Sequence, residues 1–265
     1  MNRTLTQNLS TMVDNEVRVA GFAQVIRDQK RMQFVVLRDH TGMVQLFHEK
    51  GGDDDALKAV ISTLTQESAV IAIGKVVANP SVKLGGIEVI LESLEVVGLA
   101  EAPIPITEES SLDLQLDWRA LSIRQPENSI IFRVQTTMEQ AMREFWQKHG
   151  FVEIHSPKLM GTASESGAEL FQLDYFGQKA SLAQSPQFYK QMAMAAGLDR
   201  IFEIGPVFRA NPSFTSRHDT EFTSIDVEIS WIESHEDVMD LEECNYYNFY
   251  SSFCHQYPEL LQHYL

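Results

Sequence analysis

The sequence predicts an α+β protein with two domains: a small N-terminal β-barrel and, after a linker, a domain that mixes helices and strands. Residues 16–97 contain five short segments that are rich in β-branched residues and alternate between apolar and polar positions. Residues 99–118 carry two prolines and a cluster of acids and serines, which is typical of a linker. Residues 126–149 carry apolar residues at helical spacing. A chain of 265 residues is long enough for two such domains.

The five N-terminal segments predict a barrel of the OB-fold type. A helix-like segment, residues 54–66, lies between the third and fourth strands, and this is the arrangement expected of that fold. A generic small β-barrel would give a similar pattern. The expected strands are residues 16–26, 32–38, 43–48, 69–78 and 87–97.

The second domain begins with a predicted helix over residues 126–149. Pro126 suits its first turn and Gly150 its C-terminal cap. Its apolar stripe consists of Ile130, Val134, Met138, Met142, Phe145 and Trp146.

Further strands and helices are expected in the second domain. One strand lies within residues 151–160 and ends at Pro157, and a C-terminal helix starts near Ser234. The other expected strands are residues 180–184, 201–209 and 222–232, with a helix over residues 185–197. The expected domains are a barrel at residues 1–99, a linker at 100–118 and the second domain at 119–265.

Composition limits the function classes. The two cysteines, Cys244 and Cys254, have no metal-type Cys/His spacing around them, so we expect neither a structural metal site nor a disulfide framework. A reducing, cytoplasmic location is the simpler interpretation. The N-terminal residues lack the apolar core of a signal peptide, and no apolar run approaches the length of a membrane span.

The net charge of −16 is unevenly distributed along the chain. Residues 1–50 hold seven Lys and Arg against five Asp and Glu, a net charge of +2. Residues 218–265 hold eleven acids and no Lys or Arg. Since the local face sets the attraction, a nucleic acid could still bind the N-terminal part.

Residues 205–221, "GPVFRANPSFTSRHDTE", predict an anion site. Arg209 ends an apolar strand, and Arg217 and His218 follow in the loop. A fixed pair of guanidinium groups can hold a polyphosphate through charge-assisted hydrogen bonds. The alternative is two surface arginines paired with nearby acids, namely Asp219, Glu221 or Glu228.

Two more segments suggest contacts with a small polar ligand. Glu165 lies in "TASESGAELF", a loop of small residues that suits a lid whose carboxylate holds an ammonium group. Gln187 and Lys190 lie three residues apart on one side of a helix, where they could bind a carboxylate. The alternatives are a solvated loop and an ordinary amphipathic helix with an exposed lysine.

Phe34 and Gln45 lie on neighbouring strands of the barrel. An aromatic ring beside an amide suits an unstacked base, which would stack on one and hydrogen-bond to the other. Without context, a core phenylalanine and a surface glutamine are the better explanation. Backbone contacts could come from Arg18, Arg27, Lys30, Arg31 and Arg38.

Taken together, these segments resemble the aspartyl-tRNA synthetases of the archaeal and eukaryotic type, which are class II synthetases. "GFVEIHSPKLM" is similar to the first class II motif, with Pro157 at the motif's proline. "FEIGPVFRA" and "TSRHDTEFTSIDVEISW" are similar to the second motif, "FVVLRDHTGMVQLF" to the anticodon-binding segment, and "SPQFYKQ" to the amino-acid pocket helix. The resemblance implies an OB-fold anticodon-binding domain followed by a catalytic domain built on an antiparallel sheet.

The resemblance also implies an activity and a role for each residue. A synthetase of this family activates L-aspartate with ATP and Mg²⁺, transfers it to tRNA, and is a homodimer through the first motif. Arg209 would hold the α-phosphate and the amino-acid carboxylate, and Arg217, His218, Asp219 and Asn211 would complete the ATP site. Glu165 would bind the amino group, Gln187 and Lys190 the aspartate side chain, and Phe34 and Gln45 the anticodon. No metal ligand is expected among these residues.

The sequence departs from the family pattern in two places. Asn211 stands where the second motif has a glutamate that helps to hold the nucleotide. The third motif, a glycine-rich stretch that closes on an arginine, is missing, because no glycine follows Gly205 and no Lys or Arg follows Arg217. The chain could therefore be part of a longer aspartate–tRNA ligase, a truncated relative that binds tRNA without charging it, or an enzyme that uses the aminoacyl-adenylate otherwise.

The resemblance bears on which tRNA is charged. Relatives that exclude the asparagine tRNA often carry a tryptophan shortly after the "VAG" strand, where this chain has Gln24, two residues after Phe22. An amide rejects a wrong base less firmly than a bulky ring does. We therefore expect an enzyme that charges both the aspartate and the asparagine tRNA. The alternative is that Arg27, Lys30 or another loop residue discriminates.

Overall fold

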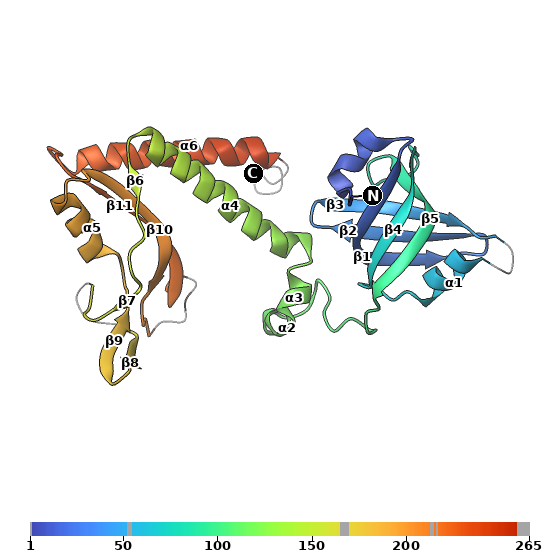
Figure 1. Ribbon diagram of the computed structural model, residues 1–265, viewed down its shortest axis with the longest axis horizontal. Coiled ribbons are helices and arrows are strands. Elements are labelled where there is room, and N and C mark those ends of the chain that lie inside the picture. Colours follow the sequence, from blue (N-terminus) through green and yellow to red (C-terminus); the bar gives the residue numbers. More distant parts are fainter. Residues whose placement is uncertain (1, 52–54, 165–169, 213–214, 216, 259–265) are drawn as a thin grey trace. The chain divides into compact units, whose positions relative to one another are not determined.

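The computed structural model describes residues 2–51, 55–164, 170–212, 215 and 217–258 (Figure 1). The chain divides into two compact units, Met1–Ser122 and Ile123–Leu265, each with its own hydrophobic core. None of the described helices has the length and apolar character needed to cross a membrane.

The first unit is a closed five-stranded barrel, which confirms the OB-fold prediction. The strands follow the order β1-β2-β3-β5-β4, and only the β3–β5 pair is parallel. Helix α1 lies between β3 and β4 as expected, and a 3₁₀ helix that the sequence did not reveal, η1 (Thr6–Met12), precedes β1. The other bounds are β1 Glu16–Asp28, β2 Met32–Asp39, β3 Gly42–Glu49, α1 Ala56–Thr63, β4 Ala69–Ala78 and β5 Ile87–Gly98.

Alternation along the barrel strands separates a core from an outer face. Val35 and Leu37 of β2 are fully buried, as are the β3 residues Val44 and Leu46, which are 1% and 0% exposed. Because successive side chains point to opposite faces, Phe34 of β2 and Gln45 of β3 lie on the outer face.

The segment that was expected to be an irregular linker is partly helical. Helix α2 (Leu112–Asp117) occupies the end of residues 100–118, and α3 (Arg119–Ser122) follows it. The Ser111 hydroxyl accepts the Leu114 N–H at 3.4 Å and caps α2. Three leucines separated by acids and an amide were interpreted as polar linker, whereas the capped turn makes them helical.

The second unit contains two small sheets and three longer helices in its described residues. One sheet has the order β11-β10-β6, with β10–β11 antiparallel and β10–β6 parallel, and the other has the order β7-β9-β8. The bounds are α4 Pro126–Lys148, β6 Val152–Glu153, β7 Leu159–Met160, β8 Gln172–Tyr175, β9 Gln178–Leu182, α5 Gln187–Ala195, β10 Arg200–Phe208, β11 Glu221–Ile229 and α6 Glu236–Gln256.

Most of these elements match the sequence prediction, and one does not. Gly150 has a φ of +81° after α4, as a C-terminal cap requires. The expected strand over residues 151–160 is wrong, because β6 and β7 are two-residue strands that pair with different sheets. Pro157 lies between them and has no N–H to continue a ladder. Strand β8 was not expected at all.

Helices α4 and α6 lie side by side (Figure 1) and cover one face of the β10–β11 hairpin. The core between them contains Trp146 of α4 and Phe202 and Ile204 of β10, with Phe249 of α6 packed against it. Residues between these positions therefore point to the opposite face of the sheet, which is where the polar residues gather.

We predict that Gly74→Ala strongly destabilises the barrel. A Cβ atom at Gly74 would lie 2.1 Å from the backbone oxygen of Ile90, at the place where the β4–β5 register shifts. Relieving this overlap requires backbone movement, so we expect a loss of about 2–4 kcal/mol in the free energy of unfolding.

Gly98→Ala is the matched control, since a Cβ there meets nothing within 4 Å. Denaturant unfolding followed by circular dichroism measures both variants. Equal midpoints for the two variants would contradict the predicted overlap.

Candidate functional sites: an outer barrel pocket and a charged sheet face

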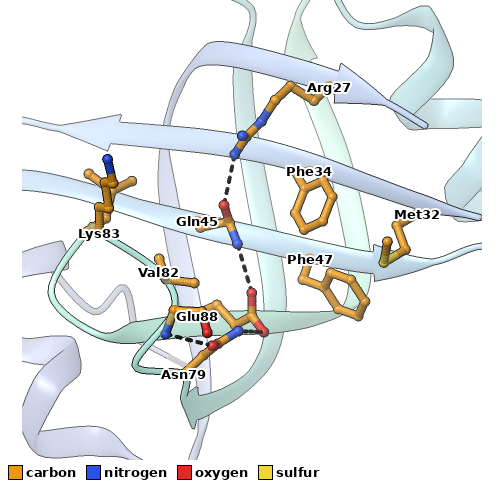
Figure 2. A pocket seen from close by; sticks show the side chains of 11 residues that line it. Arg27, Met32, Phe34, Gln45, Phe47, Asn79, Val82, Lys83 and Glu88 are labelled. Carbon is orange, nitrogen blue, oxygen red and sulfur yellow. Dashed lines mark hydrogen bonds between the residues drawn. The ribbon is translucent and has the colours of Figure 1, made fainter.

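A pocket of about 610 Å³ opens on the outer face of the barrel (Figure 2). Each of four barrel strands contributes a side chain: Arg27 from β1, Phe34 from β2, Gln45 from β3 and Glu88 from β5. The rest of the lining is Met32, Phe47, Asn79, Ser81, Val82, Lys83 and Leu84.

Directional hydrogen bonds join the polar residues of this pocket. The Arg27 guanidinium donates to Oε1 of Gln45 at 2.9 Å, and Nε2 of Gln45 donates to Glu88 at 2.8 Å. The Asn79 amide donates to the other Glu88 oxygen at 2.8 Å, and its own oxygen accepts the Ser81 N–H at 3.1 Å (Figure 2). Gln45 and Glu88 are 8% and 7% exposed, so these bonds fix two nearly buried polar groups.

The aromatic part of the pocket lies beside this chain of hydrogen bonds. The rings of Phe34 and Phe47 are 5.4 Å apart between centroids, and the Arg27 guanidinium carbon lies 5.2 Å from the centre of Phe34. Phe34 is half-buried, which leaves part of its ring accessible. A half-open ring next to amide and charged groups provides what an unstacked base needs.

The structure brings together Arg27, Phe34 and Gln45 and leaves out Gln24. Gln24 occupies the irregularity where the β1–β2 register shifts between Ala23 and Val25, and it does not line the pocket. Its Oε1 is buried and has no hydrogen-bond partner among the described residues.

Sequence reasoning missed three lining residues. Phe47 lies two positions after Gln45 on the same strand, so alternation alone could have placed it on the outer face. Glu88 reaches Gln45 through the parallel β3–β5 pair, and Asn79 reaches Glu88 across a turn. Neither contact leaves a signal in the sequence.

In the second unit, charged side chains occupy the face of β10 and β11 opposite α4 and α6. Glu203 of β10 lies directly across from Asp226 of β11, and Glu228 follows two residues later on the same face. Glu203 is 2% exposed and accepts from the Ser156 hydroxyl at 2.7 Å and from the Lys158 ammonium at 2.7 Å. The sheet face therefore carries three carboxylates, each with a lysine partner.

Lys190 of α5 supplies the partner for two of these carboxylates. Its ammonium lies 2.9 Å from Asp226 and 3.3 Å from Glu228, and the residue is 7% exposed. Burial lowers the Lys190 pKa, but the hydrogen bond and charge of Asp226, together with Glu228, outweigh it and raise the pKa above its usual value. Gln187 is half-buried one turn earlier on the helix. Lys190 is thus not the exposed lysine of an ordinary amphipathic helix.

Arg209 follows β10 and provides a cation at the end of this face. Its backbone N–H donates to the Thr220 oxygen at 3.0 Å, and its guanidinium carbon lies 5.6 Å from the centre of the Phe222 ring. The Nε atom is buried and has no hydrogen-bond partner among the described residues. A buried charged donor without a partner requires an explanation, and an anionic ligand such as a phosphate or carboxylate provides one.

The other residues of the expected nucleotide site are more open. Arg217, His218 and Asp219 are exposed in the turn before β11, and His218 Nδ1 lies 2.7 Å from the Thr215 hydroxyl. Asn211 is half-buried, and its N–H donates to the Arg209 oxygen at 2.8 Å.

Two further parts of the expected site have no counterpart to describe. Glu165 lies outside the described residues. The part of the chain that the structure describes contains no group of three or more His, Cys, Asp or Glu residues that could hold a metal ion.

Comparison with known families identifies the architecture. Residues 111–260 match the model of the class II tRNA synthetases for D, K and N. The chain belongs to this family. Residues 17–97 match the OB-fold nucleic acid binding domain, in agreement with the barrel.

Similar proteins narrow the group within the family. The chain is 44% identical to an aspartate–tRNA(Asp) ligase of Pyrococcus abyssi and 44% identical to an aspartate–tRNA(Asp/Asn) ligase of Aeropyrum pernix, covering 53% of each relative. These matches span 86% and 88% of this chain. In the part that is present, the sequence is that of an archaeal-type aspartyl-tRNA synthetase. It spans about half the length of these curated relatives.

Solved structures share the fold. Asparaginyl-tRNA synthetase from Pyrococcus horikoshii with asparaginyl-adenylate superimposes with a TM-score of 0.91 at 33% identity, and the match covers 100% of this chain and 61% of that one. A putative aspartyl-tRNA synthetase from Leishmania major gives a TM-score of 0.82 at 31% identity, covering 97% and 55%. Because aspartyl and asparaginyl enzymes share the fold, the amino acid must be argued from the site.

We predict that Lys190→Met destabilises the second unit by about 1–3 kcal/mol. The substitution leaves Asp226 and Glu228 close together without their cation, although both carboxylates keep some contact with water. Thermal unfolding measures the effect, with exposed Lys179→Met as the control. Because the Lys190 pKa is raised, its contribution is fully present below about pH 10 and is lost as the pH rises through the folded pKa. Equal stability of Lys190→Met and the native chain at neutral pH would contradict this account.

Proposed function

We propose that this chain forms the anticodon-binding domain and part of the catalytic domain of an aspartate–tRNA ligase. The enzyme would activate L-aspartate with ATP and transfer the aspartyl group to tRNA. The observation that supports this most directly is the pair of cations on one face of the β10–β11 hairpin: buried Lys190, and Arg209 with its Nε atom unpartnered among the described residues. One can bind the substrate side chain and the other the reacting groups.

Arg209 suits the first chemical step. The aspartate α-carboxylate attacks the α-phosphorus of ATP, pyrophosphate leaves, and aspartyl-adenylate forms. Negative charge builds up on the α-phosphate during this attack, and a fixed guanidinium stabilises it. A hydroxyl at the 3′ end of tRNA then attacks the adenylate carbonyl, and AMP leaves. Attack by a carboxylate requires positioning and neutralised charge more than a protein nucleophile.

The remaining expected residues complete the site. Arg217, His218, Asp219 and Asn211 surround the turn where the outer phosphates and the nucleotide would lie, and Glu165 would meet the amino group. The family resemblance implies Mg²⁺ with ATP, but the described residues form no cluster to hold it. We therefore assign it no step.

Lys190 favours aspartate over asparagine. Asp226 and Glu228 occupy two of its three N–H donors, so one remains for a ligand. A substrate carboxylate accepts this hydrogen bond with charge assistance, whereas an amide offers no charge and its NH₂ group would oppose the ammonium.

We predict strong selection of aspartate in ATP–pyrophosphate exchange by the full-length protein. An unmade charged hydrogen bond costs about 1.5–3 kcal/mol, which corresponds to more than a tenfold preference. Lys190→Ala should reduce this preference, and Arg209→Ala should lower exchange by orders of magnitude while sparing tRNA binding. Equal exchange with asparagine by the native enzyme would overturn the assignment of the amino acid.

A second candidate is a relative that binds tRNA without charging it. The lack of glycine after Gly205 and of Lys or Arg after Arg217 favours it, since the third class II motif is missing from these 265 residues. Aspartylation measured with the full-length protein separates the two proposals. A polypeptide of these 265 residues is expected to bind tRNA and not to charge it.

A homodimer and a cytoplasmic location form part of the proposal. The first motif, in α4 and β6, would supply the dimer contact. Ile131, Phe132 and Val152 are 58%, 47% and 49% exposed in these elements, which leaves apolar surface for a second copy.

We predict that the enzyme charges both the aspartate and the asparagine tRNA. No bulky ring stands at Gln24, and the pocket on the barrel serves bases that both anticodons share. Relatives of both specificities are equally similar, so charging assays with the two tRNAs must decide. A hundredfold preference for the aspartate tRNA, about 2.7 kcal/mol, would contradict this prediction. If Gln24→Trp leaves the ratio unchanged, this position does not select the tRNA.

A further inference from the structure

The side-chain amide of Gln45 is held in one orientation from both ends. Arg27 carries only hydrogen-bond donors, and it faces Oε1 of Gln45 at 2.9 Å. The Glu88 carboxylate is an acceptor at both oxygens, one for Gln45 Nε2 and one for Asn79 Nδ2, each at 2.8 Å. Turning the amide over would set N–H against N–H at Arg27 and oxygen against oxygen at Glu88.

This orientation is supported further along the chain of hydrogen bonds. Asn79 cannot turn over without losing the Ser81 N–H that its oxygen accepts at 3.1 Å. Each amide in the series therefore has a donor on one side and an acceptor on the other, from Arg27 to the β4–β5 turn (Figure 2). Because Gln45 and Glu88 are nearly buried, an unmade bond in this series is costly.

The amide retains the capacity to bind a ligand. Oε1 has a second lone pair and Nε2 a second hydrogen, since each uses one in the contacts above. A base that stacks on Phe34 and turns its Watson–Crick edge to Gln45 meets one acceptor and one donor in fixed order. Uracil presents an acceptor (O4) beside a donor (N3–H), and cytosine presents a donor (N4–H₂) beside an acceptor (N3) in the same places.

We propose that Arg27 and Glu88 are specificity-determining positioning residues, which lock the Gln45 amide so that the pocket accepts uracil and rejects cytosine. This rests on the proposed function, because the genetic code places uracil in the middle of both the aspartate and the asparagine anticodons. Selectivity comes from the fixed order of donor and acceptor, since a freely turning amide would accept both pyrimidines.

The test measures the binding of two transcripts to the 265-residue chain by fluorescence anisotropy. The transcripts are the aspartate tRNA and the same tRNA with the middle anticodon uracil changed to cytosine. The native chain should prefer the uracil transcript about ten- to hundredfold. The readout is the ratio of the two dissociation constants, so a general change in charge cancels.

Two double variants separate the lock from a mere loss of contacts. Arg27→Met with Glu88→Gln removes the charge at both ends, which should lower the preference below about threefold. Arg27→Glu with Glu88→Gln turns the Gln45 amide over. The carboxylate introduced by the first substitution accepts from Nε2, while the amide introduced by the second donates to Oε1 and still accepts from Asn79. This second pair should prefer the cytosine transcript. Lys30→Met, which removes an exposed cation outside the pocket, should weaken both transcripts equally.

Each outcome either supports or overturns the proposal, provided that the variants unfold at the native midpoint. Inverted preference in the second double variant supports it. An unchanged preference for uracil in both double variants overturns the lock. Equal binding of both transcripts by the native chain also overturns the lock but leaves tRNA binding intact. Failure of the native chain to bind either transcript better than an unrelated RNA removes the barrel's part in the proposed function as well.

Discussion

Lys190 stands between Asp226 and Glu228, and the charged face of the second unit depends on this arrangement. A nearly buried ammonium with two carboxylates is tolerable only when the partners are held in place, since an unpaired charge there would be very costly. Alternation along β10 and β11 provides that rigidity, because it commits one face to Phe202 and Ile204 and the other to the acids. The apolar packing of α4 and α6 thus fixes the geometry of the polar site on the other side of the hairpin.

The barrel uses the same principle with neutral amides in place of lysines. Its closed core, formed by residues such as Val35 and Leu46, sets the outer positions of Phe34 and Gln45. Hydrogen bonds from Arg27 to Gln45 and from Gln45 to Glu88 then give the outer face a direction. A surface patch of the same residues without these bonds would attract RNA but would not distinguish its bases.

The sequence predicted the parts of this structure that local patterns control. Alternating strands, the helical stripe of α4 and the cap at Gly150 are local signals, and the structure agrees with them. The broken strand at Pro157 and the helix α2 were missed, because pairing between distant segments and one capping hydroxyl decided them. In the sites, residue types indicated Lys190, Arg209, Phe34 and Gln45. The contacts that give them a role, Asp226 and Glu88 above all, depend on sheet register.

Amide chemical shifts of the 265-residue chain, followed by NMR during titration with the anticodon stem-loop of the aspartate tRNA, test the central claim most directly. This claim is that a preformed pocket on the outer barrel face binds the anticodon independently of the charged face of the β10–β11 hairpin. The account predicts saturable shifts at Arg27, Phe34, Gln45 and Glu88, with the amides of β10 and β11 unchanged. Saturable shifts confined to β10 and β11, or no shift at the four barrel residues, would contradict it.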